Sequence, residues 1–155
     1  MKTKIMTTCL LALLLAASAC NKEKLYASYR FICDVDGKKW ALGDSSPLDV
    51  YIVSDTVLTF TAQAGTSSLS LFVKDMGGIR VGRDYTLDGG AYGKGWYSSG
   101  QFATNALYTG TLTITNLDRK NLRISGRFNF QGVSQQSGRS VSITNGFFNS
   151  IYYPR

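Results

Sequence analysis

The sequence contains no histidine and has a single glutamate, Glu23. Without histidine the chain cannot form a His-based catalytic triad or a histidine metal site. It also lacks the side chain that most often serves as a general base in enzymes. Glycoside hydrolysis requires two carboxylates that flank one bond, and the only glutamate lies in a polar stretch near the N-terminus. We therefore expect a protein that is not an enzyme, with no catalytic residue, no cofactor and no metal site.

Cysteine is scarce, with Cys9, Cys20 and Cys33 as the only three. The first lies in an apolar N-terminal run and the second follows directly on Ala17-Ser18-Ala19. If both belong to a processed signal, Cys33 alone remains in the folded part and no disulfide can form there. The folded part must then be stabilised by an ordinary hydrophobic core.

The N-terminus is typical of a bacterial lipoprotein signal. Two lysines precede an apolar stretch over residues 5–15, which is too short to span a bilayer as a helix. The tetrad that ends at Cys20 resembles the lipobox, in which the cysteine receives a diacylglycerol and becomes the new N-terminus. We expect residues 1–19 to be a signal peptide and Cys20 to be lipidated; a secretory signal cut before Cys20 is the alternative.

The remaining chain divides into a polar tether over residues 20–25 and one domain over residues 26–155. Asn21 replaces the aspartate that usually marks inner-membrane retention, which favours lipid anchoring in the outer membrane, on its periplasmic or its outer face. Removing the signal takes away two lysines and no acid, so the formal net charge falls from +7 to +5. This mildly basic charge does not indicate nucleic-acid binding, and we expect as partners the membrane, through the lipid, and a glycan or an envelope protein.

From residue 26 onward the apolar residues repeat with a period of two, and Thr, Ser, Tyr and Phe are abundant, which predicts an all-β domain. Asp36-Gly37 is a strong hairpin signal and places Cys33 opposite Trp40 on an apolar face, so we expect a buried thiol. Gly65-Thr66 similarly places Phe60 opposite Leu71.

A third hairpin is expected around Arg119, with Ile114 opposite Ile124 and Leu112 opposite Gly126. Weaker strands are expected within residues 49–54, 80–87, 92–102 and 140–152. Asn145-Gly146 in the last of these predicts either a tight hairpin or a bulge. Together the pattern predicts a single antiparallel β-sandwich or flattened barrel of about 8–10 strands, largely connected by hairpins.

Four segments of the domain stand out, and they are Asp36-Gly37-Lys38-Lys39-Trp40, Gly110-Thr111-Leu112-Thr113-Ile114, the stretch from Ile124 to Phe130, and Ile143-Thr144-Asn145-Gly146-Phe147-Phe148. Together these segments resemble a family of small Bacteroidetes lipoproteins that is classed as a domain of unknown function. The resemblance implies an all-β envelope protein and assigns no catalytic residue.

The segment over residues 89–100 is the candidate ligand-binding site, because it combines five glycines with three aromatic residues. Tyr92, Trp96 and Tyr97 offer large flat faces with polar tips that can stack on sugar rings from a scaffolded loop. Alternatively, Trp96 and Tyr97 belong to a glycine-kinked strand and cap the sandwich.

The most basic zone contains Arg119, Lys120, Arg123, Arg127 and Arg139. It suits either contact with anionic glycans and lipid headgroups or a solvated strand face with a charged loop tip. From these features we expect a lipid-anchored cell-envelope protein that acts as a non-catalytic binding module. The alternative is a structural or accessory envelope protein with no ligand site.

Overall fold

The computed structural model describes residues 29–43 and 45–155. The predicted signal peptide, the predicted tether and Cys20 lie outside the described residues. The regular elements of the described part are strands. It contains no helix that is long and apolar enough to cross a membrane.

Twelve strands are formed within the described ranges, two of them only two residues long. They are β1 (Phe31–Val35), β2 (Lys38–Ala41), β3 (Leu48–Val53), β4 (Val57–Ala64), β5 (Ser67–Lys74), β6 (Asp84–Leu87), β7 (Gly93–Tyr97), β8 (Phe102–Ala103), β9 (Gly110–Asp118), β10 (Arg123–Ser134), β11 (Ser140–Ile151) and β12 (Tyr153–Pro154).

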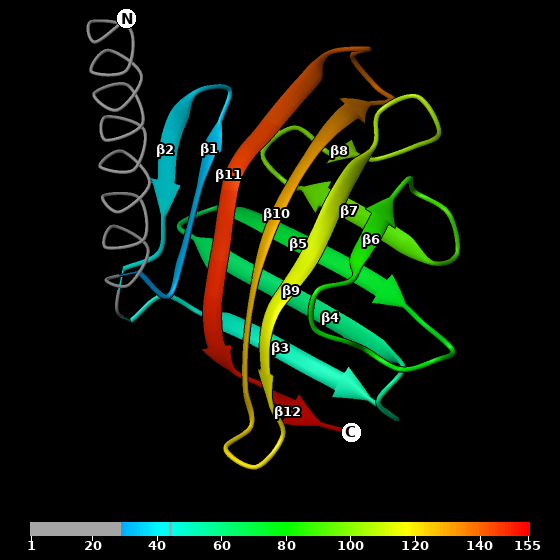
Figure 1. The fold of residues 1–155 in the computed structure, drawn as a ribbon. Coiled ribbons are helices and arrows are strands. Elements are labelled where there is room, and N and C mark those ends of the chain that lie inside the picture. The colour runs from blue at the N-terminus through cyan, green and yellow to red at the C-terminus, as the bar shows by residue number, and fades with distance from the viewer. Residues whose placement is uncertain (1–28, 44) are drawn as a thin grey trace, which may run out of the picture.

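The strands form one strongly curled sheet in the order β12-β3-β4-β5-β7-β8-β10-β11-β1-β2, with β9 on β10 and β6 on β9. Curling folds the sheet into two layers that cross one another, one built on β3, β4, β5 and β7 and the other on β9, β10, β11 and β1 (Figure 1). The short strand β8 pairs with β7 and with β10 and so joins the layers. The all-β prediction of a sandwich or flattened barrel is confirmed.

Two details of that prediction are wrong. The strand count exceeds the expected range, because β8 and β12 are too short for a periodic pattern to reveal them. The sheet is also not purely antiparallel, since Tyr153 and Pro154 of β12 run parallel to β3. In addition, β1 pairs with β11 from the other end of the chain, which no local turn signal can predict.

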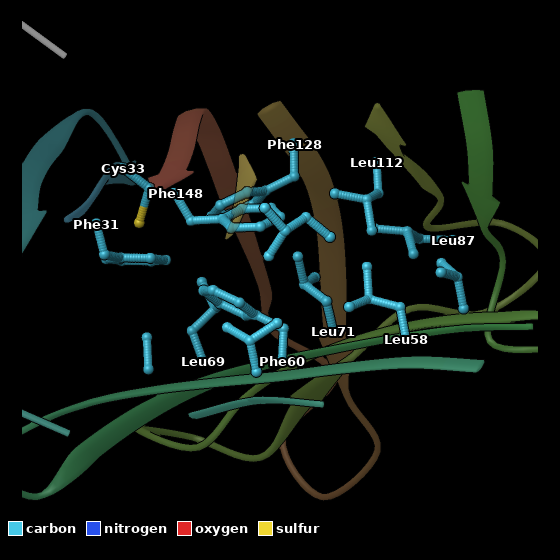
Figure 2. Close-up of a cluster of buried hydrophobic side chains, with 14 of the residues drawn as sticks. Phe31, Cys33, Leu58, Phe60, Leu69, Leu71, Leu87, Leu112, Phe128 and Phe148 are labelled. Atoms are coloured by element: carbon cyan, nitrogen blue, oxygen red, sulfur yellow. The ribbon is translucent and has the colours of Figure 1, made fainter. Parts of the chain in front are cut away.

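The core lies between the two layers, where alternate side chains of each layer point inward. Figure 2 shows Phe128, Phe148 and Leu112 on one side facing Phe60, Leu69 and Leu71 on the other. The ring of Phe60 lies 4.8 Å from that of Phe148 and 5.5 Å from that of Phe31, centroid to centroid. All three phenylalanines are almost fully buried, so the core is continuous across the layers.

The first two predicted hairpins are confirmed in register. Cys33 pairs with Trp40 across the Asp36-Gly37 turn, where both turn residues have positive φ. Phe60 pairs with Leu71 across the second turn.

The third hairpin exists, but its predicted register is wrong. Gly126 pairs with Ile114 and not with Leu112, and Phe128 takes the place opposite Leu112. The turn extends to Leu122, which adopts a φ of 53°, and a bulge follows between Ser125 and Gly126. Beyond the bulge the register is shifted by two residues, and because the side chains of a strand alternate with a period of two, a shift of two leaves every side chain on its predicted face.

Asn145-Gly146 is a bulge within β11, which settles the alternative left open by the sequence. Both neighbours of β11 show it, since β1 and β10 each change register at this point. Asn145 has a φ of 51°, and its amide donates a hydrogen bond of 2.7 Å to Asp34. The bulge sets Gly146 opposite Phe128, just as Gly126 is opposite Phe148.

Candidate functional site

The three aromatic residues of the predicted site lie on different surfaces. Tyr92 is 66% exposed in the turn before β7, whereas Trp96 and Tyr97 are successive residues of β7 and point to opposite faces. Trp96 is 41% exposed on the outside, and Tyr97 is 8% exposed. Tyr97 packs against Trp40 with ring centroids 6.0 Å apart. The structure therefore does not bring the three rings together.

The glycines of this segment serve close packing, as the glycine-kinked strand alternative expects. A Cβ at Gly93 would overlap the carbonyl oxygen of Thr86, where β6 crosses β7. A Cβ at Gly95 would lie 3.0 Å from the ring of Phe130. The middle of the predicted loop, Gly93–Tyr97, is thus a strand pressed against its neighbours, and the residues on either side of it form bends and turns.

Trp96 belongs to a wider exposed surface that we call the outer aromatic face. It is the outer side of the layer formed by β12, β3, β4, β5 and β7, and its rings are Tyr51, Phe72, Trp96 and Tyr153. Trp96 and Tyr153 are exposed by 41% and 53%, and the other two rings are half-buried. The register aligns Tyr51 with Tyr153 on one side and, through Thr59, with Phe72 on the other.

Hydroxyl groups and cations lie between these rings. Ser70 is the direct neighbour of Trp96, and its hydroxyl lies 3.1 Å from that of Thr61. Lys94 is paired with Phe72 across β5 and β7. The guanidinium of Arg155 lies 3.9 Å from the ring centroid of Tyr51 and covers one face of that ring. The rings that remain open to a ligand are those of Trp96, Phe72 and Tyr153.

Tyr92 lines a separate side cleft of about 350 Å³. Its other walls come from the end of β5, from β6 and from the turn before β7, and they carry the charged residues Lys74, Asp75, Arg83, Asp84 and Asp88.

The carboxylates of the side cleft form ion pairs and hydrogen bonds with other groups of the protein. Asp75 is buried and ion-paired with Arg83 at 2.8 Å, while the hydroxyl of Thr113 donates to Asp84. The backbone N–H of Gly90 donates to Asp88 at 2.8 Å. These contacts indicate that the acids organise the β5–β6 connection and the neighbouring turn.

The predicted basic zone is not one patch. Arg119, at the tip of the β9–β10 hairpin, donates to both carboxylate oxygens of Asp55 at 3.0 Å and to the carbonyl of Ile79. Arg139 lies in the β10–β11 connection, at the opposite end of β10 (Figure 1). Arg119 therefore fastens the hairpin tip to the β3–β4 turn.

Cys33 is fully buried in the described core. The pKa of its thiol is raised from 9.0 to about 12, mainly by burial and to a smaller extent by the neighbouring carboxylate of Asp34. Since the thiolate is the nucleophilic form, this thiol is inert in the native state. In the part of the chain that the structure describes, no cluster of three cysteines or acids could hold a metal ion.

Tyr51, Phe72 and Tyr153 were not predicted as site residues. The signal that could have found Tyr51 and Phe72 is alternation, because each occupies a position whose two neighbours in the strand point into the core. Tyr153 gives only half of this signal, since Tyr152 before it is buried and Pro154 after it is exposed. A large ring at such an outward position is a surface feature and not a core residue. Only the strand order, however, shows that the three lie on the same face as Trp96.

A family model described as Domain of unknown function (DUF6252) matches residues 30–152. The match spans all of the sheet except its short edge strand β12. No curated protein and no solved structure matches the chain.

Proposed function

Because the chain belongs to the DUF6252 family, whose function is unknown, we propose its function from the surface it presents. The protein is a lipid-anchored cell-envelope protein at the outer membrane, one of the small lipoproteins of Bacteroidetes. Its β-domain is a non-catalytic binding module that holds a glycan on the outer aromatic face.

The observation that carries this proposal is the exposed ring of Trp96 among other outward rings of one layer. Single apolar side chains on a surface are ordinary, whereas a cluster of them marks an interaction site. Trp96 and Tyr153 expose 41% and 53% of their area, and Phe72 lies between them. Phe72 and Tyr153 are three strand spacings apart, or about 14 Å, so the face is long enough for an extended ligand.

The chemistry between the rings favours a glycan over a protein partner. A sugar offers apolar C–H faces to aromatic rings and hydroxyls to neighbouring polar groups. Thr59, Thr61 and Ser70 supply such polar groups between the rings. The centre of a protein–protein interface is instead more apolar and excludes water.

The proposal predicts that Trp96→Ala strongly weakens glycan binding without unfolding the protein. Loss of the stacking ring should weaken binding on a glycan array by at least about tenfold. A half-exposed tryptophan should cost roughly 1 kcal/mol of stability when truncated, against about 3–5 kcal/mol for a buried one. Binding and thermal unfolding are measured on the same preparation.

Leu107→Ala is the matched control, because Leu107 is 86% exposed and lies outside the outer aromatic face. It should leave glycan binding unchanged. Retained binding by Trp96→Ala, or an equal loss in both variants, would contradict the proposal. Capture of a protein in place of a glycan would reassign the face to the envelope-partner alternative.

Lipid anchoring is tested separately at Cys20. Cys20→Ala should remove the acceptor thiol, so the variant should accumulate unprocessed and incorporate no labelled palmitate in growing cells. Cys9→Ala is the control and should be processed and labelled normally. Equal labelling of Cys20→Ala and the unaltered chain would rule out the anchor.

A structural envelope protein without a ligand site is the second candidate, and the burial of Tyr97 favours it. Tyr97 stacks with Phe102 at 6.4 Å and meets Trp40 edge-on, so one of the three predicted site residues is part of the core. This candidate predicts that Trp96→Ala changes stability and leaves no binding to lose.

A further inference from the structure

A second cleft, which we call the end cleft, opens where the two layers separate at one end of the sandwich. Residues of three turns line it, namely β1–β2, β7–β8 and β10–β11, and the first and last of these turns are both toward the top of Figure 1. The cleft has a volume of about 380 Å³, within the range of pockets that hold small molecules.

The floor of the end cleft is apolar. It is made by Val35, Tyr97, Phe102 and Val141, which come from both layers. Tyr97 and Val141 are buried, and Phe102 is half-buried against the ring of Tyr97 at 6.4 Å. The floor thus continues the hydrophobic core to the surface and favours the apolar part of a ligand.

The rim of the end cleft carries an excess of positive charge. Lys38 and Arg139 lie on the rim with Asp36, and neither cation forms an ion pair within the described residues. The carboxylate of Asp36 already accepts a hydrogen bond of 2.8 Å from the backbone N–H of Ser142. The rim therefore carries two positive charges and one negative charge, and the negative group already has a hydrogen-bond partner. This charge balance makes the rim complementary to an anion.

We propose that the end cleft binds a small molecule with an apolar body and one carboxylate. The apolar body lies on the Tyr97 and Phe102 floor, and Lys38 and Arg139 bind the carboxylate. Arg139 suits this role because its planar guanidinium can donate two parallel hydrogen bonds to a carboxylate. This site is independent of the outer aromatic face, since Trp96 and Tyr97 point to opposite sides of β7.

The test compares 4-phenylbutyrate with its neutral isostere 4-phenylbutyramide, each titrated into the full chain. Binding is followed by the backbone amide signals of Val35, Ser99 and Val141 in NMR spectra. The carboxylate should bind at least about tenfold more tightly than the amide, since a hydrogen bond to a charged group is worth about that factor. Signals of the β9–β10 hairpin tip should not shift.

The double variant Lys38→Gln, Arg139→Gln should remove the preference for the carboxylate and keep the weak binding of the amide. Lys120→Gln, Arg123→Gln removes the same charge at the opposite end and should leave both affinities unchanged. Both pairs are exposed, so neither double variant should disturb the core. Absence of shifts at the cleft, an equal affinity for both compounds, or an equal loss in both double variants would overturn the proposal.

Discussion

At the scale of single residues, alternation in the sequence predicts which side of the sheet a side chain occupies. Cys33 and Trp40 illustrate this, because a two-residue turn fixes their pairing and their shared face. Trp96 and Tyr97 illustrate the limit. Their adjacency requires opposite faces once they lie in a strand, but the five surrounding glycines also fit a mobile loop. A deciding contact, that of Gly95 with the ring of Phe130, joins residues far apart in sequence and leaves no local pattern.

Cys33 should make stability depend on pH above the usual thiol pKa. Burial, together with a smaller contribution from Asp34, raises the folded pKa from 9.0 to about 12. Between these values the unfolded chain loses the proton and the native protein keeps it, so the free energy of unfolding falls as pH rises. At about pH 10 the loss should be on the order of 1 kcal/mol.

Urea denaturation at about pH 7.5 and about pH 10 measures this effect, and Cys33→Ala separates it from other titrations. The variant should lose less stability over this interval than the unaltered protein, by the same order of 1 kcal/mol. Because the thiol is buried and protonated, native Cys33 should also resist thiol reagents until the protein unfolds. An identical pH dependence in both proteins would show that the thiol is not responsible.

At the scale of elements, the hydrophobic pattern predicts faces better than it predicts register. In the third hairpin a shift of two residues keeps Leu112, Ile114 and Phe128 on the inner face, so the pattern could not distinguish the two pairings. The information that was missing is the bulge between Ser125 and Gly126. For Asn145-Gly146 the pattern did allow a bulge, because both residues accept turn-like backbone angles.

Gly126 of β10 is opposite Phe148 of β11, and this pairing predicts a steric effect when Gly126 is replaced. A Cβ at this position would lie 2.6 Å from Cε1 of Phe148, and 2.9 Å from the carbonyl oxygen of Thr113. Gly126→Ala should therefore force the ring or the strand to move and cost about 1–3 kcal/mol. Differential scanning calorimetry measures the change.

Gly43→Ala is the matched control for this prediction. A Cβ at Gly43 would meet only the hydroxyl oxygen of Ser46, at 3.7 Å, which is an ordinary contact. The stability of the Gly43→Ala variant should stay close to that of the unaltered protein. Equal melting temperatures for the two variants would mean that Phe148 does not pack over Gly126.

At the scale of the whole molecule, non-local pairings decide the architecture. The β1–β2 hairpin is placed by β11, and β12 pairs with β3 across most of the chain. Neither contact follows from a turn, so the sequence predicts an all-β domain but not the order of its strands. The outer aromatic face depends on this order, because Tyr153 joins Tyr51 only through β12, with ring centroids 5.7 Å apart.

Removing β12 should therefore weaken both the fold and the proposed glycan surface. A chain that ends at Tyr152 loses the hydrogen bond from Arg155 to the carbonyl of Ile52 and the one from Ser54 to the carbonyl of Arg155, each 2.9 Å long. It keeps Tyr152, which is buried in the core. With each hydrogen bond contributing about 1 kcal/mol, the loss should be roughly 2 kcal/mol, and the bare edge of β3 should promote self-association.

Tyr153→Ala separates the two effects, because it removes the ring and keeps the backbone pairing of β12 with β3. It should weaken glycan binding while leaving the urea midpoint and the light scattering of the protein nearly unchanged. The truncated chain should lower the midpoint and raise the scattering with protein concentration. If the truncated chain is as stable and as monomeric as Tyr153→Ala, β12 does not protect the edge of the sheet. If Tyr153→Ala binds glycan normally, the ligand lies toward Trp96 and Phe72 alone.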